Sequence, residues 1–435
     1  MGGPRPDEAD RPAQSLGAGA AAHRVRPVWS HTEPDSIEAL HVVYKVAERC
    51  NINCTYCYYF NMGEQTALTR PVLASIDVTN ALARWIAQGC EELRIPCAKV
   101  TFHGGEPTLI GVKAFGDACR QLRDIIEPVA AVSLSIQTNG TLLDDRWIAA
   151  FIEHGVGVGI SIDGARAAND RFRLDRRGRS TFGGTEEAIR RLVEAQRSGG
   201  PPPATISVVH PGNDYRDIYR YLRTLGVKEM SFLLPDRNVD DVEFVSSGTA
   251  AQYGSCLSDV FLEWLSEDNL DVHIKFVDQL LVHFWPEVAP GQVFRRPRKA
   301  NQIVIARSDG TIAIDDTFIP ALSWYAGTPV YSTEKSTLRG FLADPIFGEI
   351  EETSNTLPGG CSECRWRHVC RGGDLENRFS TRNGFDNPSV YCDAYKVMFQ
   401  DVCDELVRNG YPVDLVNTKF GVNTKFGVTT KLEKP

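Results

Sequence analysis

The chain has no run of about 18 consecutive apolar residues, the length that a helix needs to cross a bilayer, so no membrane-spanning segment is expected. Its first residues lack the basic, apolar and small-residue order of a secretion signal, and we expect a cytoplasmic protein. Basic residues are also in deficit, since 47 Lys and Arg stand against 56 Asp and Glu for a net charge of −9. Without a basic stripe to neutralise phosphates, no nucleic-acid partner is expected.

Length and composition are typical of a globular protein with two or three domains. The 435 residues exceed the roughly 250–300 at which a single core usually stops growing. Twelve cysteines without an export signal are expected to be metal ligands and buried thiols rather than disulfides. Five of them, expected as small buried apolar side chains, are Cys90, Cys97, Cys119, Cys256 and Cys403.

Short apolar, β-branched segments alternate with helical patterns over the first 240 residues. Such runs are typical of parallel strands buried on both faces. Strict alternation predicts parallel pairing with right-handed crossovers, which brings the carboxyl ends of the strands together, where sites form in β/α barrels and open sheets. The predicted strands are 39–47, 98–102, 132–137, 156–162, 204–209 and 229–234.

A first group of three cysteines, Cys50, Cys54 and Cys57, follows the first predicted strand. Three thiolates at this spacing can hold three irons of a [4Fe-4S] cube and leave the fourth iron without a protein ligand. A zinc ion would want a fourth ligand, and the nearest histidines, His41 and His103, are not at ligand spacing. The spacing therefore favours an iron–sulfur cluster, with zinc as the alternative.

Polar residues follow the later strands. After the second strand, Gly104 and Gly105 would let the backbone approach a ligand closely, and Glu106 adds a carboxylate beside them. An ordinary strand-to-helix turn explains this GGEP segment equally well. Later strand ends carry the polar residues Thr138, Asn139, Ser161, Asp163 and Asp236, for which turn formation is the alternative.

The cysteine loop and the GGEP segment occur in the order seen in the radical S-adenosylmethionine (SAM) enzymes. The C-x3-C-x2-C loop after a buried strand, with Tyr56 before its last cysteine, resembles the cluster loop of that family. The resemblance implies an α/β fold with a partial (β/α)6 TIM-like barrel, and an open iron that chelates SAM and cleaves it to a 5'-deoxyadenosyl radical. It also implies a SAM site formed by Tyr56, Gly104, Gly105, Glu106, Thr138, Asn139, Ser161 and Arg173, with Asp163 beside them. For Arg173, within an arginine-rich run, a solvated loop is an equal alternative.

A second cysteine group lies near the C-terminus. It consists of Cys361, Cys364, Cys370 and the later Cys392, a set that would first suggest zinc. Its spacing instead resembles the SPASM extension of peptide-modifying radical SAM enzymes, in which such residues ligate an auxiliary [4Fe-4S] cluster.

The chain departs from the SPASM pattern at three positions. Asp315, Asp316 and Asp374 stand where, or close to where, typical relatives carry the cysteines of a second auxiliary cluster. The resemblance therefore implies one auxiliary cluster and two clusters in all.

Five segments are predicted along the chain. They are a disordered N-terminal segment at 1–36, a radical SAM barrel at 37–240, a helical bridge at 241–300, a SPASM domain at 301–410 and a flexible tail at 411–435. A hairpin is predicted around Asp309 and Gly310. The tail contains the sequence NTKFGV twice.

Two longer stretches, one around each cysteine group, resemble the cyclophane-forming peptide maturases of the Xye, Grr and Fxs type, which modify ribosomally made (RiPP) precursor peptides. That resemblance implies abstraction of a Cβ hydrogen from a precursor peptide, and addition of the carbon radical to an aromatic ring two residues away. An electron donor such as flavodoxin or ferredoxin is expected. A base must take the ring proton, and the candidates are Asp163, Asp236, Asp315 and Asp374.

Three alternatives remain open. A sulfatase-maturase-like oxidase would convert a Cys or Ser of a protein into formylglycine, but such enzymes normally keep all the SPASM cysteines. A radical SAM enzyme acting on a nucleoside or amino sugar, and a zinc-stabilised scaffold without catalytic activity, are the other two.

Overall fold

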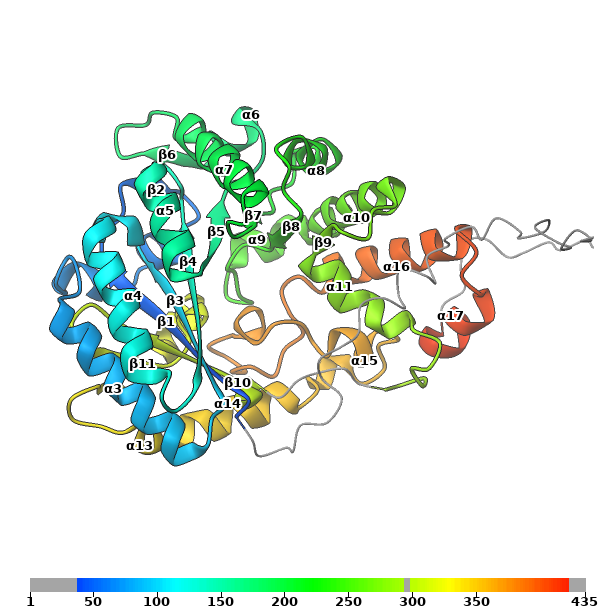
Figure 1. The fold of residues 1–435 in the computed structure, drawn as a ribbon. Coiled ribbons are helices and arrows are strands. Elements are labelled where there is room, and N and C mark those ends of the chain that lie inside the picture. The colour runs from blue at the N-terminus through cyan, green and yellow to red at the C-terminus, as the bar shows by residue number, and fades with distance from the viewer. Residues whose placement is uncertain (1–36, 293–297, 422–435) are drawn as a thin grey trace, which may run out of the picture.

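The computed structural model describes residues 37–292 and 298–421 (Figure 1). At its centre six parallel strands pair in chain order, as predicted, and their ends lie within two residues of the predicted ones. They are β1 (Ala39–Ala47), β3 (Cys97–Gly104), β4 (Ala131–Thr138), β5 (Val156–Ser161), β7 (Pro203–Val208) and β8 (Glu229–Leu233). The partial (β/α)6 barrel is therefore confirmed.

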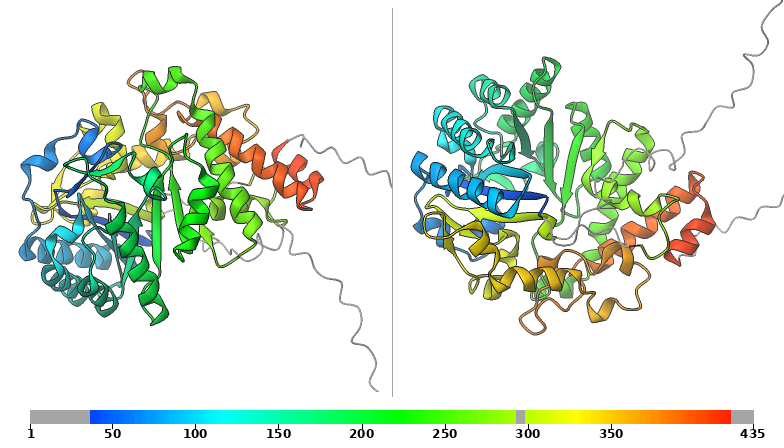
Figure 2. Two further views of the ribbon diagram at one scale, coloured as in Figure 1. Left: turned by 90° about the horizontal axis from the view of Figure 1, so that it is seen from above. Right: turned by 60° about the horizontal axis from the view of Figure 1, so that its bottom comes forward.

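Helices cover the outer face of this curved sheet (Figures 1 and 2). They are α3 (Ile76–Leu93), α4 (Val112–Ile126), α5 (Asp145–His154), α7 (Phe182–Arg197) and α8 (Tyr215–Thr224). Side chains of Ser75, Asp144 and Asp214 accept backbone hydrogen bonds at the starts of α3, α5 and α8, which satisfies amides that the helices leave unpaired.

Burial alternates along the barrel strands. In β3 and β7 every second residue is buried against the helices, while the residues between them, on the inner face, are only half-buried. The inner face is partly polar and includes Lys45, Thr101 and Ser135. The barrel thus keeps an accessible interior, whereas its outer face forms the apolar core.

The sheet continues beyond the six strands on both sides. The short strand β9 (His273–Ile274) pairs with β8, and β10 (Asn301–Ala306) pairs in parallel with β1. Strand β11 (Thr311–Ala313) is antiparallel to β10, which confirms the predicted hairpin, and β12 (Tyr331–Ser332) completes the edge. Because the sheet and the apolar core run across residue 300, the predicted division into domains remains a prediction.

Helices dominate the rest of the described chain. Helix α10 (Ala250–Glu267) lies beside α16 (Cys392–Arg408) (Figure 1). Any side chain at Gly254 of α10 would collide with the Ala394 carbonyl of α16, so this close packing requires glycine. The remaining helices and their bounds are α9 (Val242–Ser247), α11 (Lys275–Leu281), α12 (Leu322–Tyr325), α13 (Leu338–Leu342), α14 (Pro345–Asn355) and α15 (Arg367–Cys370). No helix among the described residues has the length and apolar character needed to cross a membrane.

The prediction of a flexible tail from residue 411 is wrong for its first part, because helix α17 (Val413–Phe420) lies there. Val416 and Phe420, one helical turn apart, are both buried, and the Phe420 ring lies 5.0 Å from that of Phe284 and 5.6 Å from that of Trp366. Apolar burial therefore overrides the polar composition of the first NTKFGV copy. Residues 1–36 and 422–435 lie outside the described residues.

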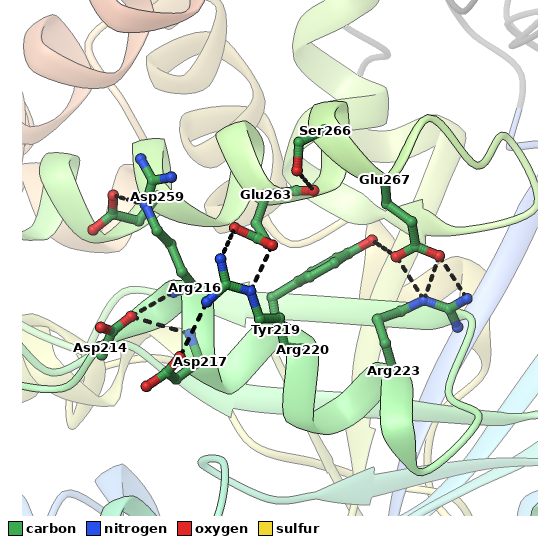
Figure 3. Close-up of polar contacts among 10 residues, drawn as sticks. All are labelled: Asp214, Arg216, Asp217, Tyr219, Arg220, Arg223, Asp259, Glu263, Ser266 and Glu267. Carbon is green, nitrogen blue, oxygen red and sulfur yellow. Dashed lines mark hydrogen bonds and ion pairs between the residues drawn. The ribbon is translucent and has the colours of Figure 1, made fainter.

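Helices α8 and α10 are joined by a ladder of arginine–carboxylate pairs (Figure 3). Arg216, Arg220 and Arg223 on α8 face Asp259, Glu263 and Glu267 on α10, at N···O distances of 3.0, 2.7 and 2.8 Å. Tyr219 also donates a hydrogen bond to Glu267. The ladder fixes α10 to the barrel helix α8, and α10 also contacts α16.

We expect Glu267→Gln to lower the free energy of unfolding at pH 7 by roughly 0.5–1 kcal/mol, as for a networked but partly exposed ion pair. The hydrogen bond from Arg223 lowers the pKa of Glu267 from 4.5 to about 2. The carboxylate therefore stabilises the fold fully above pH 4.5, and this contribution disappears as the pH falls through about 2. Thermal unfolding followed by circular dichroism measures the difference. Asp217→Asn, at an exposed carboxylate that pairs with Arg220 within α8, is the control, and an equal loss in both variants would contradict the account.

Candidate active site

The first three cysteines lie in the loop after β1. Cys54 ends the short strand β2 (Ile52–Cys54), and Cys57 directly precedes helix α2 (Tyr58–Asn61). The thiols are partly buried and close enough for their charges to interact. Burial raises the pKa of Cys50 to about 12 and that of Cys54 to about 11, so metal binding must displace their protons. These residues fit a [4Fe-4S] cluster held by three thiolates.

Gly104 and Gly105 bring the GGEP turn against this cysteine loop. Gly105 donates a backbone hydrogen bond of 2.8 Å to the carbonyl of Ala47, and Glu106 donates one of 2.8 Å to that of Arg49. A Cβ atom would lie 2.0 Å from the Ala47 oxygen if placed at Gly104, and 2.2 Å from the Arg49 oxygen if placed at Gly105. The backbone at these glycines was predicted to approach a ligand closely. In the structure it lies close to the backbone of Ala47 and Arg49, in the loop that carries Cys50.

Glu106 connects the turn to the end of β4. Its carboxylate is buried and accepts hydrogen bonds from the hydroxyls of Thr108 (2.5 Å) and Thr138 (2.6 Å) and from the amide of Asn139 (2.8 Å). Burial raises the pKa of Glu106, while these donors oppose the shift. The Asn139 side chain donates a hydrogen bond to Asn51, beside the first cysteine. Three predicted SAM residues therefore lie in one hydrogen-bond network next to the cysteine loop.

Tyr56, Asp163 and Arg173 form a second network. Arg173 donates to the Tyr56 hydroxyl (2.8 Å), which in turn donates to Asp163 Oδ2 (2.8 Å). Arg173 and Asp163 are both buried, and burial raises the pKa of Asp163. Arg173 begins strand β6 (Arg173–Asp175), which pairs with β2 so that Arg173 lies opposite Cys54. Arg173 is therefore next to the cysteine loop and not in a solvated loop.

Sequence patterns did not reveal the β2–β6 ribbon, because each strand has only three residues. Helix α6 (Arg166–Asn169) leads into β6. Ser161, at the end of β5, accepts a hydrogen bond of 2.9 Å from Gln137 on the inner face of the barrel.

Five carboxyl groups, named here the acid group, come together from three segments. They are Asp236, Asp315, Asp316, Asp374 and Glu376. Burial and the nearby charges of Asp316 and Asp315 raise the pKa of Asp236 to about 7, and burial together with Asp374 raises that of Glu376 to about 8. Of the four predicted bases, three therefore lie together, whereas Asp163 is engaged with Tyr56.

Lys45 lies next to the acid group and was not singled out from the sequence. Its ammonium is fully buried and lies 2.6 Å from Asp316 Oδ2. The signal was present, since Lys45 is the one charged residue within an otherwise apolar strand pattern. Glu376 carried no such signal, because Arg298 and Asp315, which act on it in addition to its neighbour Asp374, come from distant segments.

The second cysteine group lines a single pocket. Cys361, Cys364, Cys370 and Cys392 all border it, together with Trp366 and Tyr395 among others. Burial raises the pKa of Cys370 to about 12. The structure thus brings together all four predicted ligands of the auxiliary cluster, in a space bounded largely by apolar side chains.

The remaining cysteines behave as predicted for apolar side chains. All twelve are free thiols, and Cys90, Cys119, Cys256 and Cys403 are buried, while Cys97 is half-buried. Within residues 37–292 and 298–421, no three His, Cys, Asp or Glu side chains are arranged to hold a single metal ion. A cubane does not require that arrangement, since each thiolate binds a different iron.

The chain belongs to the radical SAM superfamily, whose family model matches residues 44–225. The serine-type anaerobic sulfatase-maturating enzyme of Klebsiella aerogenes is 32% identical over 406 residues, which cover 88% of this chain and 90% of that protein. The enzyme of the same name from Bacteroides thetaiotaomicron is 27% identical, over 83% and 89% of the two chains.

Solved structures share the fold. Native anSMEcpe with bound AdoMet superposes with a TM-score of 0.70 at 20% identity, over 85% of this chain and 98% of that one. Streptococcus suis SuiB bound to the precursor peptide SuiA gives a TM-score of 0.55 at 14% identity, over 81% and 76%. The α/β fold of SPASM-type radical SAM enzymes is thereby confirmed.

We expect the anaerobically reconstituted protein to bind about eight irons and eight sulfides, four of each per cubane. Cys370→Ala should lose about four irons and keep the first cluster, because Cys370 borders the pocket of the second cysteine group. Cys403→Ala, at a buried thiol outside both groups, is the matched control. Iron and acid-labile sulfide analysis gives the counts, and about twelve irons, or zinc without sulfide, would contradict the assignment.

Proposed function

We propose that this radical SAM enzyme joins two side chains of a ribosomally made precursor peptide by a carbon–carbon bond. In the proposed reaction a Cβ–H bond and an aromatic C–H bond are broken and one C–C bond forms, which gives a three-residue cyclophane. The substrate loses two hydrogens in total. One leaves as a hydrogen atom, and the other leaves as a proton and an electron.

The observation that carries the proposal is the contrast between the two C-terminal sites. One pocket has four cysteines, while the positions expected for a second auxiliary cluster hold Asp315, Asp316 and Asp374 of the acid group. The single auxiliary site and the sequence around both cysteine groups resemble the cyclophane-forming maturases. The carboxylates also supply a base, which ring substitution needs.

The cofactors follow from the superfamily and from the cysteine geometry. When bound, SAM and the reduced cluster at Cys50, Cys54 and Cys57 supply a 5'-deoxyadenosyl radical for hydrogen abstraction, and an auxiliary cluster at the pocket of the second cysteine group supplies an acceptor for the remaining electron. The Glu106 network holds the turn beside the cysteine loop, where we propose that SAM binds together with Tyr56, Ser161 and Arg173. A flavodoxin or ferredoxin is proposed as electron donor.

We propose Asp236 as the residue that takes the ring proton. It follows the last barrel strand and lies close enough to Asp315 and Asp316 for their charges to act on it. A pKa of about 7 lets the carboxylate be deprotonated at neutral pH and still hold the proton that it accepts. Asp163 is a weaker candidate, because Tyr56 and the amide of Val208 already occupy its oxygens.

A peptide partner is supported by the substrates named for the structural neighbours. SuiB was solved with its precursor peptide SuiA, and anSMEcpe with the Cp18Cys peptide.

Formylglycine formation is the second candidate, because the related proteins of Klebsiella aerogenes and Bacteroides thetaiotaomicron carry the name of sulfatase-maturating enzymes. Oxidation of a Ser to formylglycine also removes two hydrogens, so mass alone does not separate the two reactions. The products differ chemically, since formylglycine is an aldehyde and a cyclophane is not.

The deciding experiment incubates the reconstituted enzyme, SAM and reductant with two peptides. One is a precursor peptide from a neighbouring reading frame with aromatic three-residue motifs, and the other carries the modified Ser of a sulfatase. We expect the first to lose two hydrogens, to resist backbone fragmentation within the motif and to give no hydrazone. A hydrazine-reactive product from the sulfatase peptide, with the aromatic peptide unchanged, would overturn the proposal.

Asp236→Asn should lower the yield of crosslinked peptide by about a hundredfold, the order of magnitude of general-base catalysis. Formation of 5'-deoxyadenosine should stay within about twofold, because hydrogen abstraction precedes proton loss. In the unaltered enzyme the crosslinking rate should rise with pH through about 7, as Asp236 becomes ionised. Asp240→Asn, four residues away, is the control, and equal yields from both variants would exclude Asp236 as the base.

A further inference from the structure

We propose that Lys45 is a positioning residue that holds the acid group in register with the cysteine loop. The inference rests on the proposed function, in which the loop binds the cluster and the acid group accepts the proton. Neither the sequence motifs nor the matched family assigns a role to Lys45.

Lys45 forms a closed triangle with Asp316 and Tyr58, three residues from separate segments. The Lys45 ammonium lies 2.6 Å from Asp316 Oδ2 and 3.4 Å from the Tyr58 hydroxyl, and that hydroxyl lies 3.3 Å from Asp316 Oδ1. Tyr58 follows Cys57 directly and begins α2. The triangle therefore connects β1, the cysteine loop and the segment that carries Asp315 and Asp316.

The groups around the Lys45 ammonium favour a cation at this position. It lies 4.3 Å from the ring centre of Tyr59 and 5.6 Å from that of Tyr58, so aromatic faces cover the side that Asp316 leaves free. The Tyr59 hydroxyl in turn donates a hydrogen bond of 2.5 Å to the buried Glu48. Tyr58 and Tyr59 are thus fixed by Lys45 and Glu48, two buried charged residues of the β1 segment.

Stability alone does not account for this arrangement. Removing an ammonium and a carboxylate from water costs free energy that their attraction often fails to recover, and apolar replacements are frequently neutral or stabilising. Buried pairs of this kind can instead specify a unique register between segments. Here the Lys45–Asp316 pair sets the position of Asp316 relative to Cys57. The charge of Asp316 in turn acts on Asp236.

The same arrangement explains how the segment at Asp315 and Asp316 is held in place. In the pattern that the sequence resembles, cysteines in this region bind a cluster, which would tie the segment down. In this chain Asp316 pairs with Lys45, and Asp315 pairs with Arg298 at 3.0 Å. Two ion pairs therefore hold the segment where metal ligation would otherwise do so.

The test is a double-mutant cycle with Lys45→Met and Asp316→Asn, in which both replacements keep nearly the size of the original side chain. The measured quantity is the amount of 5'-deoxyadenosine formed per modified peptide, whatever the modification. If Lys45 acts through Asp316, each single variant raises this ratio about tenfold and the double variant raises it about tenfold as well. If the two residues acted independently, the double variant would raise this ratio about a hundredfold, which would overturn the proposal.

A second readout does not need the peptide. The electron paramagnetic resonance spectrum of the reduced, SAM-bound cluster should change in Lys45→Met, because Tyr58 loses its tether beside Cys57. Lys99→Met is the matched control, since Lys99 is an inner-face lysine of β3 that contacts Asn301 and should leave spectrum and ratio unchanged. An unaltered spectrum in Lys45→Met at full iron content would also overturn the proposal.

The two readouts separate the inference from the function on which it rests. If no peptide is modified by the unaltered enzyme but the spectrum changes as expected, the crosslinking proposal fails and the positioning role stands. If crosslinking occurs but the effects of the two single variants on the ratio multiply in the double variant, the crosslinking proposal stands and the positioning role fails. Should Lys45→Met fail to fold, Tyr58→Phe, which removes one oxygen from the triangle, takes its place. Its spectrum must then differ from that of the unaltered enzyme, and an unchanged spectrum at full iron content would overturn the proposal.

Discussion

The structure of the site depends on one backbone contact, in which the turn at Gly104 and Gly105 lies directly against the cysteine loop. The hydrogen bonds from this turn to Ala47 and Arg49 leave no room for a Cβ atom at either glycine. That contact places Glu106 where it can accept hydrogen bonds from the end of the next strand. The order of strands, the turn and the cysteine loop are therefore parts of one arrangement, and a larger residue at either glycine would separate them.

Much of the fold could be predicted because its signals are local. The apolar runs of the six barrel strands are bounded by turns, and the Asp309–Gly310 pair marks the hairpin. The β2–β6 ribbon could not be predicted, since three-residue strands have no period to detect. The helix at the end of the described chain was missed because its burial depends on Phe284 and Trp366, which lie far away in sequence.

In the site, too, local sequence signals could be predicted and contacts between distant segments could not. Cysteine spacing identified both groups, and the structure places each group together. The partners of Tyr56 and the convergence of the acid group depend on contacts between distant segments, which spacing does not encode. The hydrogen bond from Tyr56 to Asp163 spans more than a hundred residues of sequence, and it makes Asp163 a weaker candidate base, because it joins Asp163 to Tyr56 in the network that includes Arg173.

The protein combines a superfamily core with an altered C-terminal site. Membership of the radical SAM superfamily and the shared fold account for the barrel and the first cysteine group. Where a second auxiliary cluster would be expected from the SPASM resemblance, carboxylates are gathered around Lys45 and Arg298. Under the proposed function, these carboxylates stand in place of a redox group and supply a base for the ring proton.

The central claim is that three cysteines leave one iron of their cluster open to SAM. The most direct measurement is the formation of 5'-deoxyadenosine by the iron-loaded protein with SAM and a strong reductant under anaerobic conditions. The account predicts reductive cleavage that is lost in Cys54→Ala and retained in Cys403→Ala. Failure of the fully loaded protein to form any 5'-deoxyadenosine would contradict it.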